Sequence, residues 1–233
     1  MILSKLVRGS RMPDPVVDVP AGRPVPHVSL RHGEGPDPAA RLYAGPHGLS
    51  WADGLRPGDR LRGVLWARWT TVPGGGPAGA GGVHPGRQVH AMRNLLCRVC
   101  ACRVGADARG LLFLVPAVRG PVEGLLTVDP PVCVPCAGRI AGPDPSAWTA
   151  LRVPVPDGYG VVGGIHRPGP AGTVVPVAGR QAVMVPFGDL RAPWTVAAAM
   201  IRTLRGATRT SLAREARTRS PRAGPREGSI PFG

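Results

Sequence analysis

The chain has 233 residues and a formal net charge of +15, and all but one of its 29 basic residues are arginine. Glycine and proline, with 34 and 29 residues, are abundant enough for irregular segments to be expected, while a hydrophobic fraction of 43% allows a core of limited size. The longest apolar run, residues 111–115, is too short to span a bilayer, and the first residues lack the apolar stretch of a secretion signal. We therefore expect a cytoplasmic protein without a membrane partner.

The N-terminal segment 1–58 is dense in proline and glycine and shows little hydrophobic periodicity. It is predicted to be mostly irregular, with one or two short edge strands. Residues 63–72 are rich in β-branched and aromatic side chains and predict the first clear strand. The glycine-rich residues 73–82 then predict a flexible loop.

A short amphipathic helix is predicted next, between this loop and the first cysteines. Pro85 suits the first turn of a helix, and Val89, Met92 and Leu96 form an apolar stripe. Two strands, 110–118 and 123–128, follow the first cysteines, and we expect them to pair as a hairpin.

The C-terminal part predicts four more strands, one long helix and a basic tail. Prolines inside the apolar runs indicate edge strands or bulges. The four runs are 151–155, 159–165, 172–177 and 181–187. Residues 189–206 predict the longest helix, and the tail 207–233 is predicted to be disordered, although its first part could be helical. The apolar face of the long helix would comprise Trp194, Ala197, Ala198, Ile201 and Leu204.

The five cysteines indicate a metal site. Cys97 and Cys100 are separated by two residues, as are Cys133 and Cys136, and this spacing lets two sulfurs converge on one tetrahedral ion. Two such pairs supply the closed four-sulfur shell of a structural Zn²⁺ site, which leaves no coordination position for a reacting water. Cys102 is left over, and we expect a free thiol, although it could replace Cys100 as a ligand.

Two alternatives stay open for these cysteines. The four paired cysteines could be buried apolar side chains without a metal. The second pair, CVPC, also resembles the dithiol motif of thioredoxin-like proteins, although such a motif follows a strand in a βαβ unit and needs no second CxxC.

The predicted order around the cysteines is a knuckle, a hairpin and a helix that begins at the last two ligands. This order resembles a treble-clef zinc finger. We therefore predict an α+β fold in which a treble-clef-like zinc finger, 84–141, is inserted in or packed on a small, mostly antiparallel β-sheet with a C-terminal helix. The zinc-stabilised domain would span 59–206, between an irregular N-terminal segment and a disordered tail.

Four segments together resemble a group of small actinobacterial proteins of similar length that carry a paired CxxC zinc finger. The resemblance extends over about residues 60–212. It implies a zinc finger and no particular activity, and it agrees with an arginine content that partly reflects a G/C-rich genome. The segments are 63–68, 84–100, 130–137 and 197–206.

The basic charge predicts association with DNA or RNA, mainly through phosphate and with low specificity, because aromatic residues are only 4% of the chain. The alternative is a protein-interaction or scaffold module, in which Trp66, Trp69 and Trp194 lie in the core or at a partner surface. The arginines assigned to phosphate are Arg87, Arg93, Arg98, Arg103, Arg139, Arg202, Arg205, Arg209, Arg214 and Arg217.

A catalytic role is not expected. Treble-clef nucleases of the HNH type keep a histidine between the two ligand pairs, and residues 103–132 contain none. His84 and His90 precede the first pair, but residues six apart do not share a helix face, so helix-capping or solvated roles are predicted for them. An HNH-like relative that lacks the catalytic histidine is therefore the least favoured reading.

Overall fold

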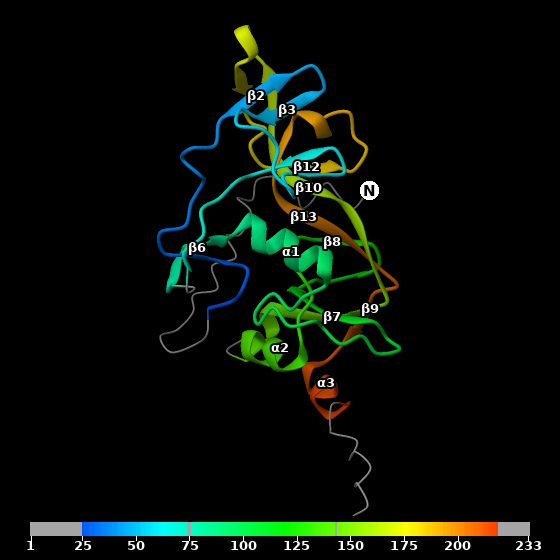
Figure 1. The fold of residues 1–233 in the computed structure, drawn as a ribbon. Coiled ribbons are helices and arrows are strands. Elements are labelled where there is room, and N and C mark those ends of the chain that lie inside the picture. Colours follow the sequence, from blue (N-terminus) through cyan, green and yellow to red (C-terminus); the bar gives the residue numbers. More distant parts are fainter. Residues whose placement is uncertain (1–24, 74–75, 143, 219–233) are drawn as a thin grey trace, which may run out of the picture.

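The computed structural model describes residues 25–73, 76–142 and 144–218. It is an α+β fold with several small sheets, mostly antiparallel, and three helices among these residues. Figure 1 shows a β-rich lobe at one end, helix α1 at the centre, and helices α2 and α3 with strands β7 and β9 at the other end. Among the described residues, no helix is both long and apolar enough to cross a membrane.

The main sheet is built on a long antiparallel pair, β10 (Val155–Pro168) and β13 (Thr195–Arg205). Their register shifts twice, between Gly158 and Gly160 and between Val162 and Gly163, so these irregularities lie at glycines and not at the prolines from which bulges were predicted. β11 and β12 pair with β10, β5 pairs in parallel with β13, β4 pairs with β5, and β8 pairs with β13. Their bounds are β4 (Arg60–Leu61), β5 (Val64–Trp66), β8 (Leu125–Thr127), β11 (Val174–Pro176) and β12 (Val183–Pro186).

The prediction of a long helix over 189–206 is wrong, because most of this segment is strand β13. Only a short 3₁₀ turn, Ala192–Trp194, precedes the strand. The strand is paired on both sides and largely buried, so its apolar residues need not alternate with polar ones. Long-range pairing with β10 outweighs the helix propensity of its three consecutive alanines.

A second sheet contains β7 (Leu111–Pro116), β9 (Trp148–Val153) and β14 (Thr208–Thr210). The predicted hairpin between the cysteine pairs is wrong, because β7 pairs with β9 whereas β8 pairs with β13 of the main sheet. Five consecutive residues of β7 are buried, so this strand requires cover on both faces, which a two-stranded hairpin cannot give.

The two sheets are continuous through the backbone at two neighbouring points. β9 runs into β10 through Pro154, and β13 runs into β14 through Gly206. Gly206 has a φ of 67°, and a Cβ there would lie 2.9 Å from Cγ of Pro154. Glycine therefore fits both the backbone conformation and the close approach of the two crossings.

The N-terminal region holds more regular structure than predicted. β1 (Ser29–Arg31) pairs with β6 (Ala78–Val83), so the glycine-rich segment 73–82 is partly a strand. β2 (Leu42–Gly45) and β3 (Gly48–Trp51) form a hairpin. The part of the N-terminal prediction that falls on residues 1–24 lies outside the described residues.

The helix predicted before the first cysteines is confirmed as α1 (Pro85–Asn94). The ring of His84 caps it, since Nδ1 accepts a hydrogen bond from the backbone of Arg87. The buried amide of Gln88 fastens the helix to β13 through the backbone N–H and C=O of Met200.

Two further helices lie near the second cysteine pair. The helix expected there is confirmed as α2 (Val134–Ala141). The first part of the basic tail is helical, as the sequence allowed, and forms α3 (Leu212–Thr218). The disorder predicted for the rest of the tail falls on residues from 219 onward, outside the described residues. Glu215 of α3 is fully buried and pairs with Arg109 and Arg152, which anchors this helix on the second sheet.

Candidate metal centre

The first cysteine pair lies on a tight turn that follows α1. The helix ends at Leu95, whose φ is 53°, and this left-handed residue turns the chain toward Cys97. The backbone N–H of Cys97 donates to the carbonyl of Cys102 at 2.8 Å, and the N–H of Ala101 donates to the carbonyl of Cys97 at 2.9 Å. These bonds bring Cys97 and Cys100 onto one closed turn.

The second cysteine pair begins α2. Cys133 is the N-cap of the helix and Cys136 lies in its first turn. The turn that carries Cys97 and Cys100 is hydrogen-bonded to the segment just before α2, because the backbone N–H of Arg98 donates to the carbonyl of Pro131 at 3.0 Å. The guanidinium of Arg98 also pairs with Asp129 at 2.6 Å. These contacts hold the two cysteine pairs together, although Cys100 and Cys133 are 33 residues apart in the sequence.

The four sulfurs of Cys97, Cys100, Cys133 and Cys136 all lie within 4.8 Å of one another. The Sγ atoms of Cys100 and Cys133 are 3.8 Å apart. A tetrahedral Zn²⁺ with Zn–S bonds of 2.3 Å requires sulfurs about 3.8 Å apart, so this set fits such an ion. The structure thus confirms that the four predicted cysteines are close enough to hold a metal ion.

The four cysteines differ in their exposure to solvent. Cys97 and Cys136 are buried in the same apolar cluster as the interior of β7, Cys133 is half-buried, and Cys100 is exposed. Burial raises the pKa of the Cys136 thiol well above its usual range, with the neighbouring cysteines adding to the effect. Burial opposes ionisation of Cys100, but the hydrogen bond from the backbone of Cys102 and those from the other three cysteines lower its pKa to about 7.

Hydrogen-bond donors reach all four sulfurs, and the backbone N–H of Cys136 donates to that of Cys133. The backbone N–H of Cys133 donates to Sγ of Cys97 at 3.5 Å, and that of Cys102 donates to Cys100. Nη2 of Arg139 donates to Sγ of Cys136 at 2.9 Å. Such donors stabilise thiolate, the form in which cysteine binds a metal.

Cys102 is exposed and is not one of the four grouped sulfurs. Its proximity to Cys100 raises the pKa of its thiol. The position fits the expectation that this cysteine is left over from the metal set.

Comparisons with protein-family models, curated proteins and solved structures found no match to this chain.

Several of the arginines assigned to phosphate are engaged in the fold instead. Arg87 pairs with the buried carboxylate of Glu34, and Arg98 with Asp129. Arg202 donates to the carbonyls of Met92 and Pro156. Sequence reasoning could not separate these arginines from exposed ones, because their partners are distant in the chain.

The other assigned arginines lie nearer the surface. Arg205 faces Asp157 at 3.6 Å, and Arg209 donates to two backbone carbonyls at 2.8 Å. Arg139 donates to the sulfur of Cys136. Four exposed arginines, for which phosphate binding stays a prediction, are Arg93, Arg103, Arg214 and Arg217.

The tryptophans and histidines singled out from the sequence differ in their burial. Trp66 is buried, whereas Trp69 and Trp194 are half-buried. The capping role predicted for His84 is confirmed, and His90 is exposed. Within the ranges that the structure describes, the four cysteines are the only group of three or more metal-ligand side chains close enough to share an ion.

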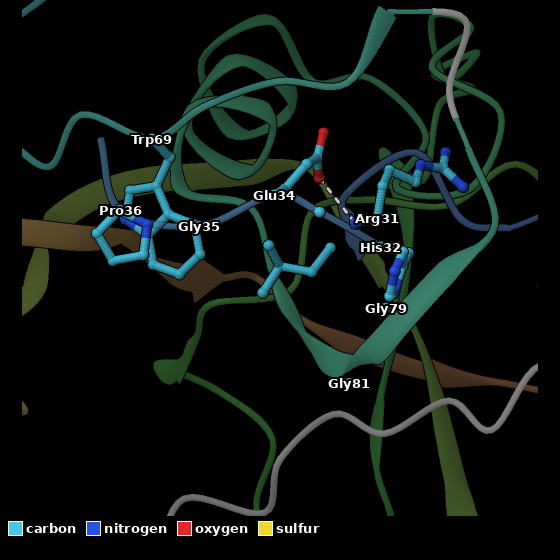
Figure 2. Close-up of a pocket in the computed structure, with 10 residues that line it drawn as sticks. Arg31, His32, Glu34, Gly35, Pro36, Trp69, Gly79 and Gly81 are labelled. Carbon is cyan, nitrogen blue, oxygen red and sulfur yellow. Dashed lines mark hydrogen bonds between the residues drawn. The ribbon is translucent and has the colours of Figure 1, made fainter. Parts of the chain in front are cut away.

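A cavity of about 290 Å³ lies away from the cysteines, between residues 30–36, Trp69 and β6. Figure 2 shows Trp69 beside Pro36 on one side and the glycines of β6 on the other. The carboxylate of Glu34 at this cavity already accepts from Arg87 and from the backbone of Arg31. Its charge is therefore used within the fold.

Proposed function

We propose that this chain is a zinc-stabilised, non-catalytic protein that associates with nucleic acid mainly through phosphate contacts. The observation that carries the zinc part is the spacing of the four sulfurs, which suits a tetrahedral ion. A shell made only of cysteine sulfurs favours Zn²⁺ among the common divalent ions of proteins. A cytoplasmic location, where thiols stay reduced, belongs to the same proposal.

Cys97, Cys100, Cys133 and Cys136 would hold the ion. When bound, it supplies a rigid cross-link between the turn after α1 and the start of α2, and no position for substrate. The knuckle and the helix that starts at its ligands keep the likeness to a treble clef. The hairpin of that motif is replaced here by strands of two sheets.

Metal content tests this part directly. We expect one zinc per chain, and loss of zinc when Cys97 or Cys136 is changed to serine. The matched control is Cys102→Ser, which should keep the metal. Purified protein that contains no zinc, and that takes up none on reconstitution under reducing conditions, would refute the metal site.

The nucleic-acid part is supported by how the charges are distributed. The buried or half-buried carboxylates Glu34, Asp59, Asp129 and Glu215 all pair with arginine inside the fold. This leaves Arg214 and Arg217 on the exposed surface of α3, at the start of the basic tail. Exposed arginines that neutralise phosphate release counterions, so binding should weaken steeply with salt.

The test compares two double variants that remove the same charge. Arg214→Gln with Arg217→Gln changes α3, whereas Arg167→Gln with Arg180→Gln changes exposed arginines of the β-rich lobe. For duplex DNA, the slope of log K against log salt should become shallower by about 2 in the α3 variant and stay unchanged in the control. Absence of binding at low salt, or equal effects of both variants, would contradict the proposed interface.

A protein-interaction module is the second candidate, and one surface feature favours it. Leu190 is 93% exposed and lies beside the half-buried Trp194, along a shallow groove that Ile165 and Pro168 also line. An exposed leucine next to a tryptophan is typical of a binding surface. Copurification of a protein partner that survives nuclease and moderate salt, and that Leu190→Asp abolishes, would support this candidate over the first.

A further inference from the structure

The metal centre and its surroundings give Arg139 a role different from phosphate binding. Arg139 lies three residues after Cys136 on α2, so both side chains are on one face of the helix. Its Nη2 is 2.9 Å from Sγ of Cys136. This contact is shorter than the 3.5 Å bond that the backbone of Cys133 makes to Cys97.

The sulfur that Arg139 contacts belongs to one of the two buried cysteines of the set. Cys136 is 1% exposed and packs in the apolar cluster that includes Ala137 and Ala141. Cys100, by contrast, is exposed to water. A thiolate without water needs donors from the protein, because burial of an uncompensated charge is costly.

The charge of the complete site adds to this need. Zn²⁺ with four thiolates carries a formal charge of two minus, which a cation next to the sulfurs reduces. The guanidinium supplies both a positive charge and an N–H donor at a buried ligand. A side chain held in this way is less available to a phosphate.

We propose that Arg139 is a positioning residue of the zinc centre, whose guanidinium donates a hydrogen bond to the buried ligand Cys136 and slows loss of the ion. The inference depends on the proposed zinc site but not on nucleic-acid binding. It reassigns Arg139 from the phosphate-binding set to the metal centre.

The experiment uses the full chain and three variants. Arg139→Gln removes the charge, Arg139→Lys keeps it without the planar fork, and Arg180→Gln is a control that lowers the net charge equally at an exposed site. Zinc affinity is measured by competition with a chromophoric chelator. Loss of a hydrogen-bond donor to a metal ligand typically lowers metal affinity by about 10-fold to 100-fold, so we expect a loss of about 10-fold in Arg139→Gln, a smaller one in Arg139→Lys and none in the control.

Co²⁺ substitution supplies a readout that a purely structural role would not move. Loss of the hydrogen bond to Cys136 raises the energy of the sulfur electrons, so the thiolate-to-cobalt absorption band should shift to longer wavelength in Arg139→Gln. The control should keep the wild-type band. Arg139→Lys serves the same comparison if the glutamine variant does not fold.

The outcomes separate the inference from the proposed function. Zinc-loaded wild type with unchanged affinity and band position in the Arg139 variants would overturn the role of Arg139 alone. A shallower salt slope for DNA in Arg139→Gln, with metal binding intact, would return this residue to the phosphate-binding set. Wild type that holds no zinc would overturn the metal site itself, and this role with it.

Discussion

Replacement of Glu215 by alanine should release α3 from the second sheet and destabilise the protein. The Glu215 side chain is 0% exposed, and its carboxylate accepts from Arg152 at 2.5 Å, Arg109 at 2.9 Å and the hydroxyl of Thr210 at 2.7 Å. Arg152 is itself buried, so the variant leaves a buried cation whose remaining carboxylate partner is the more distant Asp107, at 3.4 Å. Removal of one partner from a buried ion pair costs about 3 to 5 kcal/mol of unfolding free energy.

Urea denaturation measures this change, with Arg217→Ala, an exposed residue of the same helix, as the control. We expect the midpoint of thermal unfolding to fall by roughly 6 to 12 °C at the lower bound of 3 kcal/mol for a chain of this size. Hydrogen exchange should also become faster in residues 212–218. A loss below about 1 kcal/mol, with α3 still protected, would refute the view that this buried cluster anchors the helix.

Three further predictions concern other buried groups. Chelation of the metal should lower the unfolding midpoint of the wild type and of Cys102→Ser. Cys97→Ser should unfold at this lower midpoint whether or not chelator is present. A wild-type midpoint that does not change with chelator would contradict the prediction. Arg87 lowers the pKa of Glu34 to about 2, so the stabilisation from this ionised carboxylate is complete above pH 4.5 and is lost as the pH falls toward 2. In unfolding titrations, the unfolding free energy of Glu34→Gln should therefore depend less on acid pH than that of the wild type. Gln88→Ala removes three buried hydrogen bonds and should cost about 2 to 4 kcal/mol, and a loss under 1 kcal/mol in the same titrations would argue against its role in fastening α1.

Local patterns in the sequence were sufficient where one segment determines the outcome. The spacing of Cys97 and Cys100 fixes how two sulfurs can converge, and Pro85 with its apolar stripe fixes α1. Strands β9 to β12 follow from short apolar runs bounded by glycine and proline. Each of these features depends on neighbours within a few residues.

Features that depend on distant partners could not be predicted in this way. The alanines of β13 fit a helix locally, and only pairing with β10 makes them a strand. The strands on either side of Gly120 look like one hairpin, yet they join different sheets. The arginines give the same lesson, since Arg98 and Arg202 are indistinguishable from surface residues until their buried partners are known.

The passage of two strands between the sheets, at Pro154 and Gly206, has a consequence for cooperativity. A small domain on a flexible linker can unfold alone, whereas here the β-sheet beside the four cysteines is joined to the main sheet at two points, from β9 into β10 and from β13 into β14. Disorder that begins at the cysteines would pull β9 and β14 away from their neighbours and strain the ends of β10 and β13. The two lobes should therefore unfold in one transition. Disruption of the four cysteines should then lower the stability of the strands at the far end of the molecule as well.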